Sequence, residues 1–554
     1  MNNNVNNYIV APETTSNAIA TIEKGEQHSC SSHVNRQLIF AALGQHHLPG
    51  AAFEAQPANA GCMPGTRVHF LEQVLTLLAT RTRPHIAWIV GMAGTGKTSI
   101  ATTLCRILWA KDTVLLGGSF FCSRSTGTIE RTEVQRIVPT LATILGRHFP
   151  AYALALAKQL CELPDVAHWS PQKQVEILLT LPLAENPWCD GQIVFVVDAL
   201  DECSDQGKLV ELIDALADFK SELPVKFLLT SRPEMYIRRT PISDPDFSSV
   251  LRLHTVEHTQ VTPDLRLYIE QTLLRVSRST TWYTQFDVEA LVQRSDGLFI
   301  FASTVLKYIL DRNNDDGRKD RLRKVTSTVS HTPASISSLD QIYELVLTEA
   351  SRPEKVDTDE LEDTRRILAC ILTARASLSI QVLADLTDIS PATLRGALER
   401  LPSLVHVPDV DADSGIRTLH ASFGDYMFDR AENLIRITPG FGHGHLAHGC
   451  LRRLEWDDLC FNISVSRSSF EPNPDDVPGW ISSSLCYACL HWAHHLDAAS
   501  NGSTFDKDVD RVFQRKLLFW LEVLSVMKEL SVASGLLRMA ASVVGLLFCF
   551  IHAH

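Results

Sequence analysis

The amino-acid sequence predicts an α/β core, built as a parallel sheet with helices on both faces, followed by a helical domain, a winged-helix-like domain and a further helical region. Two observations predict the core. Short runs that are apolar throughout alternate with helical stretches, and a glycine-rich loop directly follows the first run. A third observation marks where the core ends, because apolar residues recur at helical spacing beyond about residue 255.

The apolar runs are short enough to be strands, and buried parallel strands have this continuous apolar character. The predicted strands are Ile86–Val90, Val114–Phe121, Ile193–Val197, Val225–Thr230 and Val250–Leu253. Helices are predicted before and between them over Val68–Leu78, Glu133–Leu145, Gln172–Leu181 and Lys208–Phe219.

The glycine-rich loop reads Gly-Met-Ala-Gly-Thr-Gly-Lys-Thr over residues 91–98 and matches G-x4-G-K-[ST] between a strand and a helix. Glycines let successive N–H groups approach phosphate oxygens, and the following helix adds its positive end. Lys97 can reach the β- and γ-phosphates, and Thr98 can ligate Mg²⁺. The core is therefore predicted to be a P-loop NTPase whose nucleotide-binding residues are Gly91, Ala93, Gly94, Thr95, Gly96, Lys97, Thr98 and Ser99.

A second motif follows the third strand and places Asp198 at its carboxyl end, where open α/β sheets bind ligands. A carboxylate there can hold Mg²⁺ directly or through water. Asp201 and Glu202 follow at a spacing that suits orienting and deprotonating an attacking water. An ordinary strand followed by a solvated acidic turn is the alternative interpretation.

A third motif ends the fourth strand, where Arg232 precedes Pro233. We expect Arg232 to sense the γ-phosphate or the nucleotide state, with a surface arginine as the alternative.

Beyond the core, helices are predicted over Thr262–Leu274, Asp287–Arg294, Leu298–Leu310 and Leu339–Ala350, and the charged run of residues 313–321 is predicted to be a solvated loop. Three further helices, Thr364–Leu372, Ile380–Leu386 and Pro391–Leu401, precede two strand-like runs, Leu404–Val407 and Ile416–His420. This pattern is typical of a winged helix.

The bulk composition limits the partners. The net charge of −13 argues against nucleic-acid binding, and no partner of that kind is expected. The 13 cysteines show no framework spacing, no signal peptide is visible, and the apolar run 539–551 is too short to span a bilayer. We therefore expect a cytoplasmic chain without a membrane partner. The pair Cys486 and Cys489 suggests core packing on one helix face in preference to a zinc site.

The motifs together resemble the fungal NACHT-domain proteins of the STAND class, a nephrocystin-3-like N-terminal NACHT family related to NOD-like receptors. The most specific segment is Asp198-Ala-Leu-Asp-Glu202. Other matching segments are residues 62–67, 118–124, 229–233, 296–301, 339–343, 419–426 and 519–525.

The resemblance implies that Lys97 and Thr98 contact phosphate and Mg²⁺, that Asp198 is the Walker B acid, and that Glu202 activates water beside Asp201. It also implies that Arg232 is a sensor and that His420 contacts the ADP β-phosphate in a closed state. The usual Met-His-Asp triplet reads Leu-His-Ala here, so a structural role for His420 stays open.

The expected domains are an N-terminal polar segment and linker (1–60), the NACHT core (61–255), a helical domain (256–355), a winged-helix-like domain (356–432) and a C-terminal helical region (433–554) that is truncated before any repeat array. The resemblance implies a switch that binds ATP or ADP with Mg²⁺, hydrolyses ATP slowly and forms a homo-oligomer when activated. Protein partners would act through effector or sensor regions that are not recognisable here. A nucleotide-binding scaffold without hydrolysis is the alternative, and a small-molecule P-loop kinase is disfavoured because no second substrate-like motif is present.

Overall fold

The computed structural model of the protein describes residues 37–57, 60–81, 83–110, 114–124, 129–185, 191–219, 223–253, 258–276, 282–327, 338–352, 357–408, 415–431, 435–465, 479–499 and 505–544. The chain divides into two compact units. The described residues up to 303 form the first unit, and those from 304 onward form the second.

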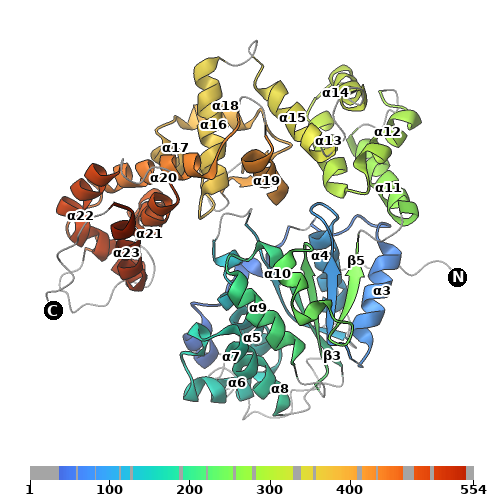
Figure 1. The fold of residues 1–554 in the computed structure, drawn as a ribbon, viewed down its shortest axis with the longest axis horizontal. Helices are drawn as coiled ribbons and strands as arrows, with labels where there is room; N and C mark the ends of the chain where they lie inside the picture. The colour runs from blue at the N-terminus through green and yellow to red at the C-terminus, as the bar shows by residue number, and fades with distance from the viewer. Residues whose placement is uncertain are drawn as a thin grey trace. The chain divides into compact units, whose positions relative to one another are not determined.

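The first unit contains a parallel five-stranded sheet in the order β2-β3-β4-β1-β5 (Figure 1). All five strands lie where the apolar runs predict them, which confirms the α/β core. Their bounds are β1 (Ile86–Val90), β2 (Val114–Phe121), β3 (Gln192–Asp198), β4 (Val225–Ser231) and β5 (Ser248–Arg252).

Alternate residues of each strand pack on opposite faces of the sheet, because side chains alternate along a strand. One face takes Phe195 and Val197 and is covered by α5 (Ile137–His148), α6 (Pro150–Glu162), α7 (Pro171–Gln174), α8 (Leu181–Ala184) and α9 (Gln206–Ala217). The other face takes Val194 and Val196 and is covered by α3 (Val68–Ala79) and α4 (Lys97–Trp109). A six-residue π-helix, Val175–Thr180, joins α7 to α8.

The strand order places three carboxyl ends side by side. β4 lies between β1 and β3, with Val90 paired to Ser231 and Val197 paired to Leu229. The loop after β1, the acidic segment after β3 and the arginine after β4 therefore leave the sheet at one edge. Ligands of open parallel sheets bind at such an edge.

The remaining elements are mainly helical. In the first unit α10 (Met235–Arg238), α11 (His258–Val276) and α12 (Gln285–Ser295) follow, and α13 (Phe299–Leu310) crosses into the second. The second unit continues with α14 (Asp315–Ser327), α15 (Ser338–Ala350), α16 (Thr358–Thr373), α17 (Ile380–Thr387), α18 (Pro391–Leu398), α19 (Ala421–Asp429), α20 (Pro439–Leu454), α21 (Ser483–Ala498), α22 (Asp506–Val526) and α23 (Ala533–Val544).

The prediction of a loop over residues 313–321 is wrong, since helix α14 begins at Asp315, but of this run only Arg321 is buried. Arg321 is only 8% exposed because its guanidinium pairs with Asp311. A single arginine of a charged run can therefore pack inward where carboxylates from other segments lie close to it, here Asp311 and the buried Glu349.

After α18 a short antiparallel pair forms between β6 (Val405–His406) and β7 (Arg417–Thr418). The predicted turn between these strands lies mostly outside the described residues, as does the end of the apolar run after α23. Among the described helices, none combines the length and the apolar composition that a bilayer span requires.

Candidate nucleotide-binding site

The loop after β1 has the backbone that its glycines permit. Gly94 and Gly96 have φ angles of 78° and 91°, a region that residues with a Cβ rarely adopt. Gly94 also lies against α13, because a Cβ built at this glycine would come within 1.8 Å of Ile300 Cγ2. The loop thus depends on glycine at Gly94 for both conformation and space.

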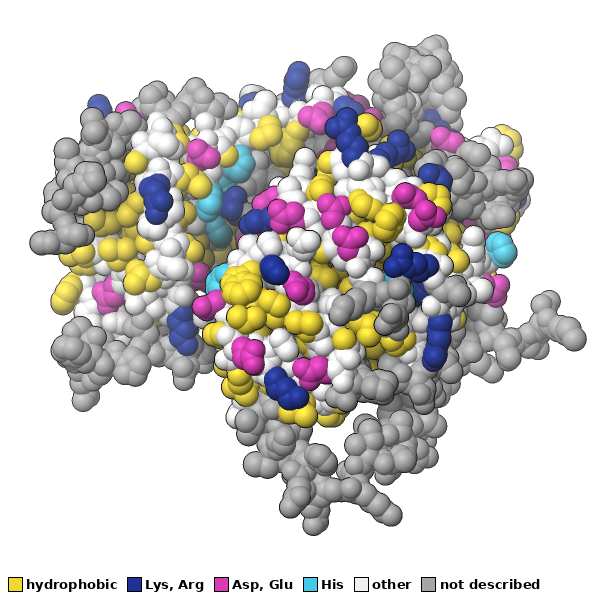
Figure 2. Space-filling view, turned by 60° about the horizontal axis from the view of Figure 1, so that its bottom comes forward, with side chains coloured by type: hydrophobic (Ala, Val, Ile, Leu, Met, Phe, Trp, Pro, Cys, Tyr) yellow, Lys and Arg dark blue, Asp and Glu magenta, His cyan; other side chains and the backbone are white. Residues whose placement is uncertain are grey.

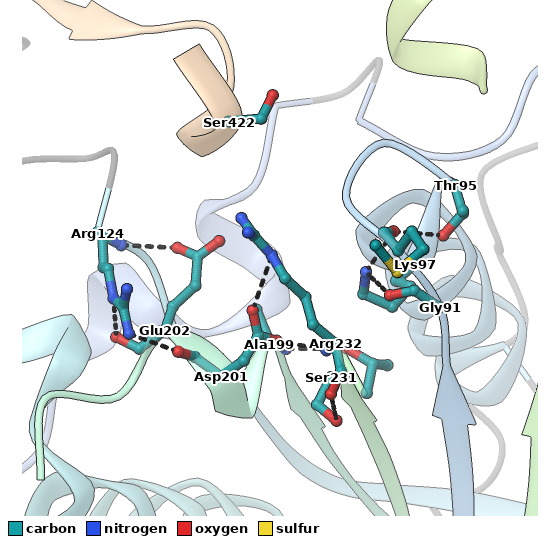
Figure 3. A network of polar contacts seen from close by, with 12 residues as sticks. Gly91, Thr95, Lys97, Arg124, Ala199, Asp201, Glu202, Ser231, Arg232 and Ser422 are labelled. Carbon is teal, nitrogen blue, oxygen red and sulfur yellow. Dashed lines mark hydrogen bonds and ion pairs between the residues drawn. The ribbon is translucent and has the colours of Figure 1, made fainter. Parts of the chain in front are cut away.

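Lys97, the first residue of α4, folds back over this loop. Its Nζ donates to the carbonyl oxygens of Gly91 and Met92 at 2.8 and 3.0 Å (Figure 3). Burial lowers the pKa of Lys97, while Asp201 and Asp198 act in the opposite direction. The ammonium group thus lies where the helix N-terminus and loop N–H groups favour an anion.

Thr98 and Asp198 join the loop to the end of β3. Thr98 Oγ1 donates to Asp198 Oδ2 at 2.7 Å, and Thr230 Oγ1 donates to Oδ1 of the same carboxylate at 2.6 Å. Burial raises the pKa of Asp198, while the two hydroxyl donors act against it. A hydroxyl and a buried carboxylate at this distance fit the oxygen ligands that Mg²⁺ prefers.

The residue after Asp198 adopts an unusual conformation that helps to hold this geometry. Ala199 has a φ of 58°, which is uncommon for a residue with a Cβ. Its N–H donates to Thr230 Oγ1 at 2.8 Å. Thr230 therefore fixes both the carboxylate and the backbone turn into Leu200–Glu202, a single 3₁₀ turn.

Asp201 is engaged by the arginine that follows β4. Its Oδ1 accepts the Arg232 N–H at 2.8 Å, and Oδ2 lies 3.1 Å from Arg232 Nε (Figure 3). Asp201 is 7% exposed, so this ion pair is largely shielded from solvent. The pair connects the ends of β3 and β4 and fixes the direction of the Arg232 side chain.

Glu202 is engaged by Arg124, which follows β2. Glu202 Oε2 accepts the Arg124 N–H at 2.8 Å, and the Arg124 guanidinium donates to the carbonyls of Asp201 and Glu202 at 2.6 and 3.2 Å (Figure 3). Burial raises the pKa of Glu202 to about 7, although the Arg124 N–H opposes this shift. A carboxyl with this pKa can accept a proton near neutral pH.

The structure thus brings Lys97, Thr98, Asp198, Asp201, Glu202 and Arg232 to one edge of the sheet. Of the other loop residues, Thr95 Oγ1 donates to Met92 O, and Ala93 and Ser99 are partly exposed.

The sequence assigned no role to three residues that shape this site: Arg67, Arg124 and Thr230. Arg67 Nη2 donates to the loop carbonyl of Thr95 at 3.1 Å, its N–H donates to Asp264, and its guanidinium lies over the Phe299 ring. All three residues lie within or beside segments that carry the family resemblance. Their position in these segments is the signal by which the sequence could have identified them as residues of the site.

His420 belongs to the second unit and caps α19. Its Nδ1 accepts the Ser422 N–H at 3.1 Å, the hydrogen bond by which an N-cap side chain satisfies a free N–H of the first helical turn. Its expected contact with a nucleotide therefore stays a prediction.

Cys486 and Cys489 lie on α21, where Cys489 is fully buried. Within the described ranges no three His, Cys, Asp or Glu side chains are grouped as metal ligands. On the face in Figure 2, Lys and Arg side chains lie among Asp and Glu side chains.

Three comparisons with known proteins bear on this site. A family model described as Nephrocystin 3, N-terminal, matches residues 65–232, the segment from the start of the core to Arg232. Vegetative incompatibility protein HET-E-1 of Podospora anserina is 22% identical over 501 residues, which cover 83% of this chain and 34% of that relative. The chain thus spans about a third of the length of this curated relative.

Among solved structures, Drosophila ORC bound to DNA is 12% identical with a TM-score of 0.23, over 92% of this chain and 78% of that one. A second ORC complex, with poly(dA/dT) DNA, is 13% identical with a TM-score of 0.22, over 94% and 75%. Scores this low carry no argument about fold or function. The family model and the fungal relative support a fungal NACHT-type family for this chain.

Proposed function

We propose that this chain is an ATP/ADP-binding signalling switch of the NACHT/STAND class that hydrolyses ATP slowly. The observation that carries the proposal is the contact of Thr98 with Asp198 at 2.7 Å, beside the Asp201–Arg232 ion pair. This arrangement joins a phosphate-binding loop to a metal-binding carboxylate and to a cation that can respond to phosphate. Few structural roles would require all three at one sheet edge.

Nucleotide binding is assigned to the loop and to α4. The N–H groups between Gly91 and Ser99 and the N-terminus of α4 would hold the phosphates, and Lys97 would exchange its carbonyl contacts for phosphate oxygens. Thr98 and Asp198 would hold Mg²⁺, which supplies charge neutralisation for the phosphates when bound.

Hydrolysis is assigned to Glu202, which would accept a proton from the attacking water. Water adds to the γ-phosphorus, the bond to the β-phosphate oxygen breaks, and ADP and phosphate leave. Arg232 would stabilise the charge on the transferred group, and Asp201 would hold Arg232 in place.

Switching requires that ADP and ATP differ in their affinity for two states of the chain. We assign the closed state to ADP, with His420 of the winged-helix-like domain (356–432) as its contact to the β-phosphate. ATP would release this contact and allow a homo-oligomer to form, and hydrolysis would reset it. The fungal relative is a vegetative incompatibility protein, so a role in non-self recognition or cell-death signalling belongs to the same proposal.

One observation favours the alternative of a scaffold that binds nucleotide without hydrolysis. Glu202 Oε2 is occupied by the Arg124 N–H, which would have to be released or shared before this oxygen accepts a proton. The two functions differ in whether ATP is converted once bound.

The test is the nucleotide that the purified chain carries, released by denaturation and separated. Near-stoichiometric ADP in the wild type, and ATP retained in Glu202→Gln after loading with Mg·ATP, supports the switch. Lys97→Ala should lose the nucleotide, while Lys208→Ala, which removes a partly exposed lysine paired with Asp205, should keep it. An empty wild-type chain that also takes up no Mg·ATP would refute both functions, and ATP retained unhydrolysed by the wild type would favour the scaffold.

A further inference from the structure

The turn that carries the two acidic side chains of the site, Leu200–Glu202, is held from both neighbouring strands. From the β4 side, Arg232 binds the Asp201 carboxylate. From the β2 side, the Arg124 guanidinium donates to the main-chain carbonyls of Asp201 and Glu202 at 2.6 and 3.2 Å. Arg124 therefore fixes the main chain from which the Glu202 side chain extends.

Arg124 also holds one end of the Glu202 carboxylate. Its N–H donates to Oε2 at 2.8 Å, whereas Oε1 has no hydrogen-bond or ion-pair partner among the described residues. Figure 3 shows this second oxygen pointing away from Arg124, and Glu202 is partly exposed. One oxygen is thus fixed by the protein, and the other is left available to a water molecule.

The position of Arg124 is itself fixed by contacts at the end of β2. Arg131 turns back to this strand, where its Nε and Nη2 both donate to Phe121 O at 3.0 and 2.9 Å. The Ser123 N–H donates to the Arg131 carbonyl at 3.3 Å. Arg124 therefore extends toward Glu202 from a stretch of main chain that is anchored at Phe121 and Ser123.

A carboxylate that accepts a proton from water must lie within hydrogen-bond reach of that water, and a displacement of about 1 Å can cost about a hundredfold in rate. A guanidinium suits this positioning task because its donors are planar and fixed in direction, whereas an ammonium group acts as a point charge. Burial raises the pKa of Glu202, and the Arg124 N–H opposes this shift because it favours the ionised carboxylate. The contacts of Arg124 therefore influence both the position of Glu202 and its proton affinity.

We propose that Arg124 is a positioning residue, which holds Glu202 by Oε2 so that Oε1 receives the proton of the water that adds to the γ-phosphorus. The bond from the γ-phosphorus to the β-phosphate oxygen breaks in this reaction, and ADP and phosphate leave. The inference rests on the proposed function, because it takes Glu202 as the base for ATP hydrolysis. It implies that the contact of Arg124 with Oε2 persists throughout, since the proton goes to the other oxygen. This contact then no longer favours a scaffold without hydrolysis.

The test compares the wild type with Arg124→Ala, Arg124→Lys and Arg136→Ala, each as the full chain, in single-turnover hydrolysis of Mg·ATP. Arg136→Ala is the matched control and should change nothing, since it removes a guanidinium that donates to the main-chain carbonyl of Gln45 instead. Arg124→Ala should bind ATP within about twofold of the wild type but hydrolyse it at least about tenfold more slowly. The midpoint of its pH–rate profile should rise by about 0.5 unit, because the contact that favours ionised Glu202 is loosened. Arg124→Lys should restore only a small part of the rate, because it supplies the charge without the planar set of donors.

Amide hydrogen exchange over residues 199–204 measures the stability of the turn without hydrolysis, and these amides should exchange at least about fivefold faster in Arg124→Ala than in the wild type or Arg136→Ala. A wild type that binds ATP and hydrolyses none would refute the proposed hydrolysis. A wild type that hydrolyses ATP, beside an Arg124→Ala variant with an unchanged rate or an unchanged pH midpoint, would overturn the positioning role alone. A full rate in Arg124→Lys would also overturn it, since the charge would then be sufficient.

Discussion

Thr98 donates its hydroxyl hydrogen to Asp198 at 2.7 Å, although 100 residues of sequence separate them. This contact exists because β4 lies between β1 and β3, so the segments that follow these strands meet at one edge. The hydroxyl and the carboxylate thus form a pair that neither α4 nor β3 provides alone.

The first prediction concerns this pair. Asp198→Asn should reduce the Mg²⁺-dependent part of ATP affinity by about tenfold or more, because an amide replaces the charged ligand. Titration calorimetry with ATP in Mg²⁺ and in EDTA measures this part. Thr102→Val is the control, since the Thr102 hydroxyl donates to the main-chain carbonyl of Thr98 and is not one of the proposed metal ligands. An Asp198→Asn variant with undiminished Mg²⁺ dependence would contradict the metal assignment.

A second prediction follows from the pKa of Glu202, which burial raises to about 7. If Glu202 accepts the proton from water, hydrolysis requires its ionised form, so single-turnover rates should rise about tenfold from pH 6 to pH 8. Glu202→Gln should abolish most of the rate while ATP still binds. A wild-type rate that is flat across this range would exclude Glu202 as the base.

The third prediction separates backbone strain from crowding in the loop. Gly96→Ala introduces strain only, because nothing lies within 4 Å of the added Cβ, whereas Gly94→Ala also collides with Ile300. Gly94→Ala should therefore lower the free energy of unfolding by about 1–3 kcal/mol more than Gly96→Ala. Adding Ile300→Ala should recover part of this loss, as a double-mutant cycle measured by urea denaturation would reveal. Equal costs for the two glycine variants would show that Ile300 can move aside.

A fourth prediction concerns acid stability and the histidines that surround His495. His443 Nδ1 lies 2.8 Å from His495 Nδ1, and Tyr487 bonds to His495 Nε2. Burial lowers the pKa of His491 to about 3 and that of His494 to about 4, and the nearby Arg375 acts in the same direction.

These histidines bind protons more weakly in the folded chain than in the unfolded chain, where the pKa is near 6.5. Their contribution to stability is therefore complete above pH 6.5 and is lost as the pH falls toward 4. His491→Gln should reduce the pH dependence of the free energy of unfolding by about one proton over this range. Identical pH dependence in wild type and His491→Gln would refute the assignment.

The sequence by itself determined the parallel core and the glycine-rich loop that follows its first strand. The strand runs are apolar throughout because both faces of the sheet are buried, and this property is visible without a structure. The loop can also be recognised from the sequence alone, since its glycines and Lys97 all lie between residues 91 and 97. The burial of Arg321 could not be predicted, because periodicity cannot reveal that Asp311, which lies outside α14, pairs with its guanidinium.

Only the tertiary structure decided which side chains meet. The Arg124 N–H donates a hydrogen bond to Glu202, and the Thr230 hydroxyl donates one to Asp198. The Arg67 guanidinium donates to the loop carbonyl of Thr95. These contacts join segments that are far apart in the chain, so they depend on the strand order and not on local propensity.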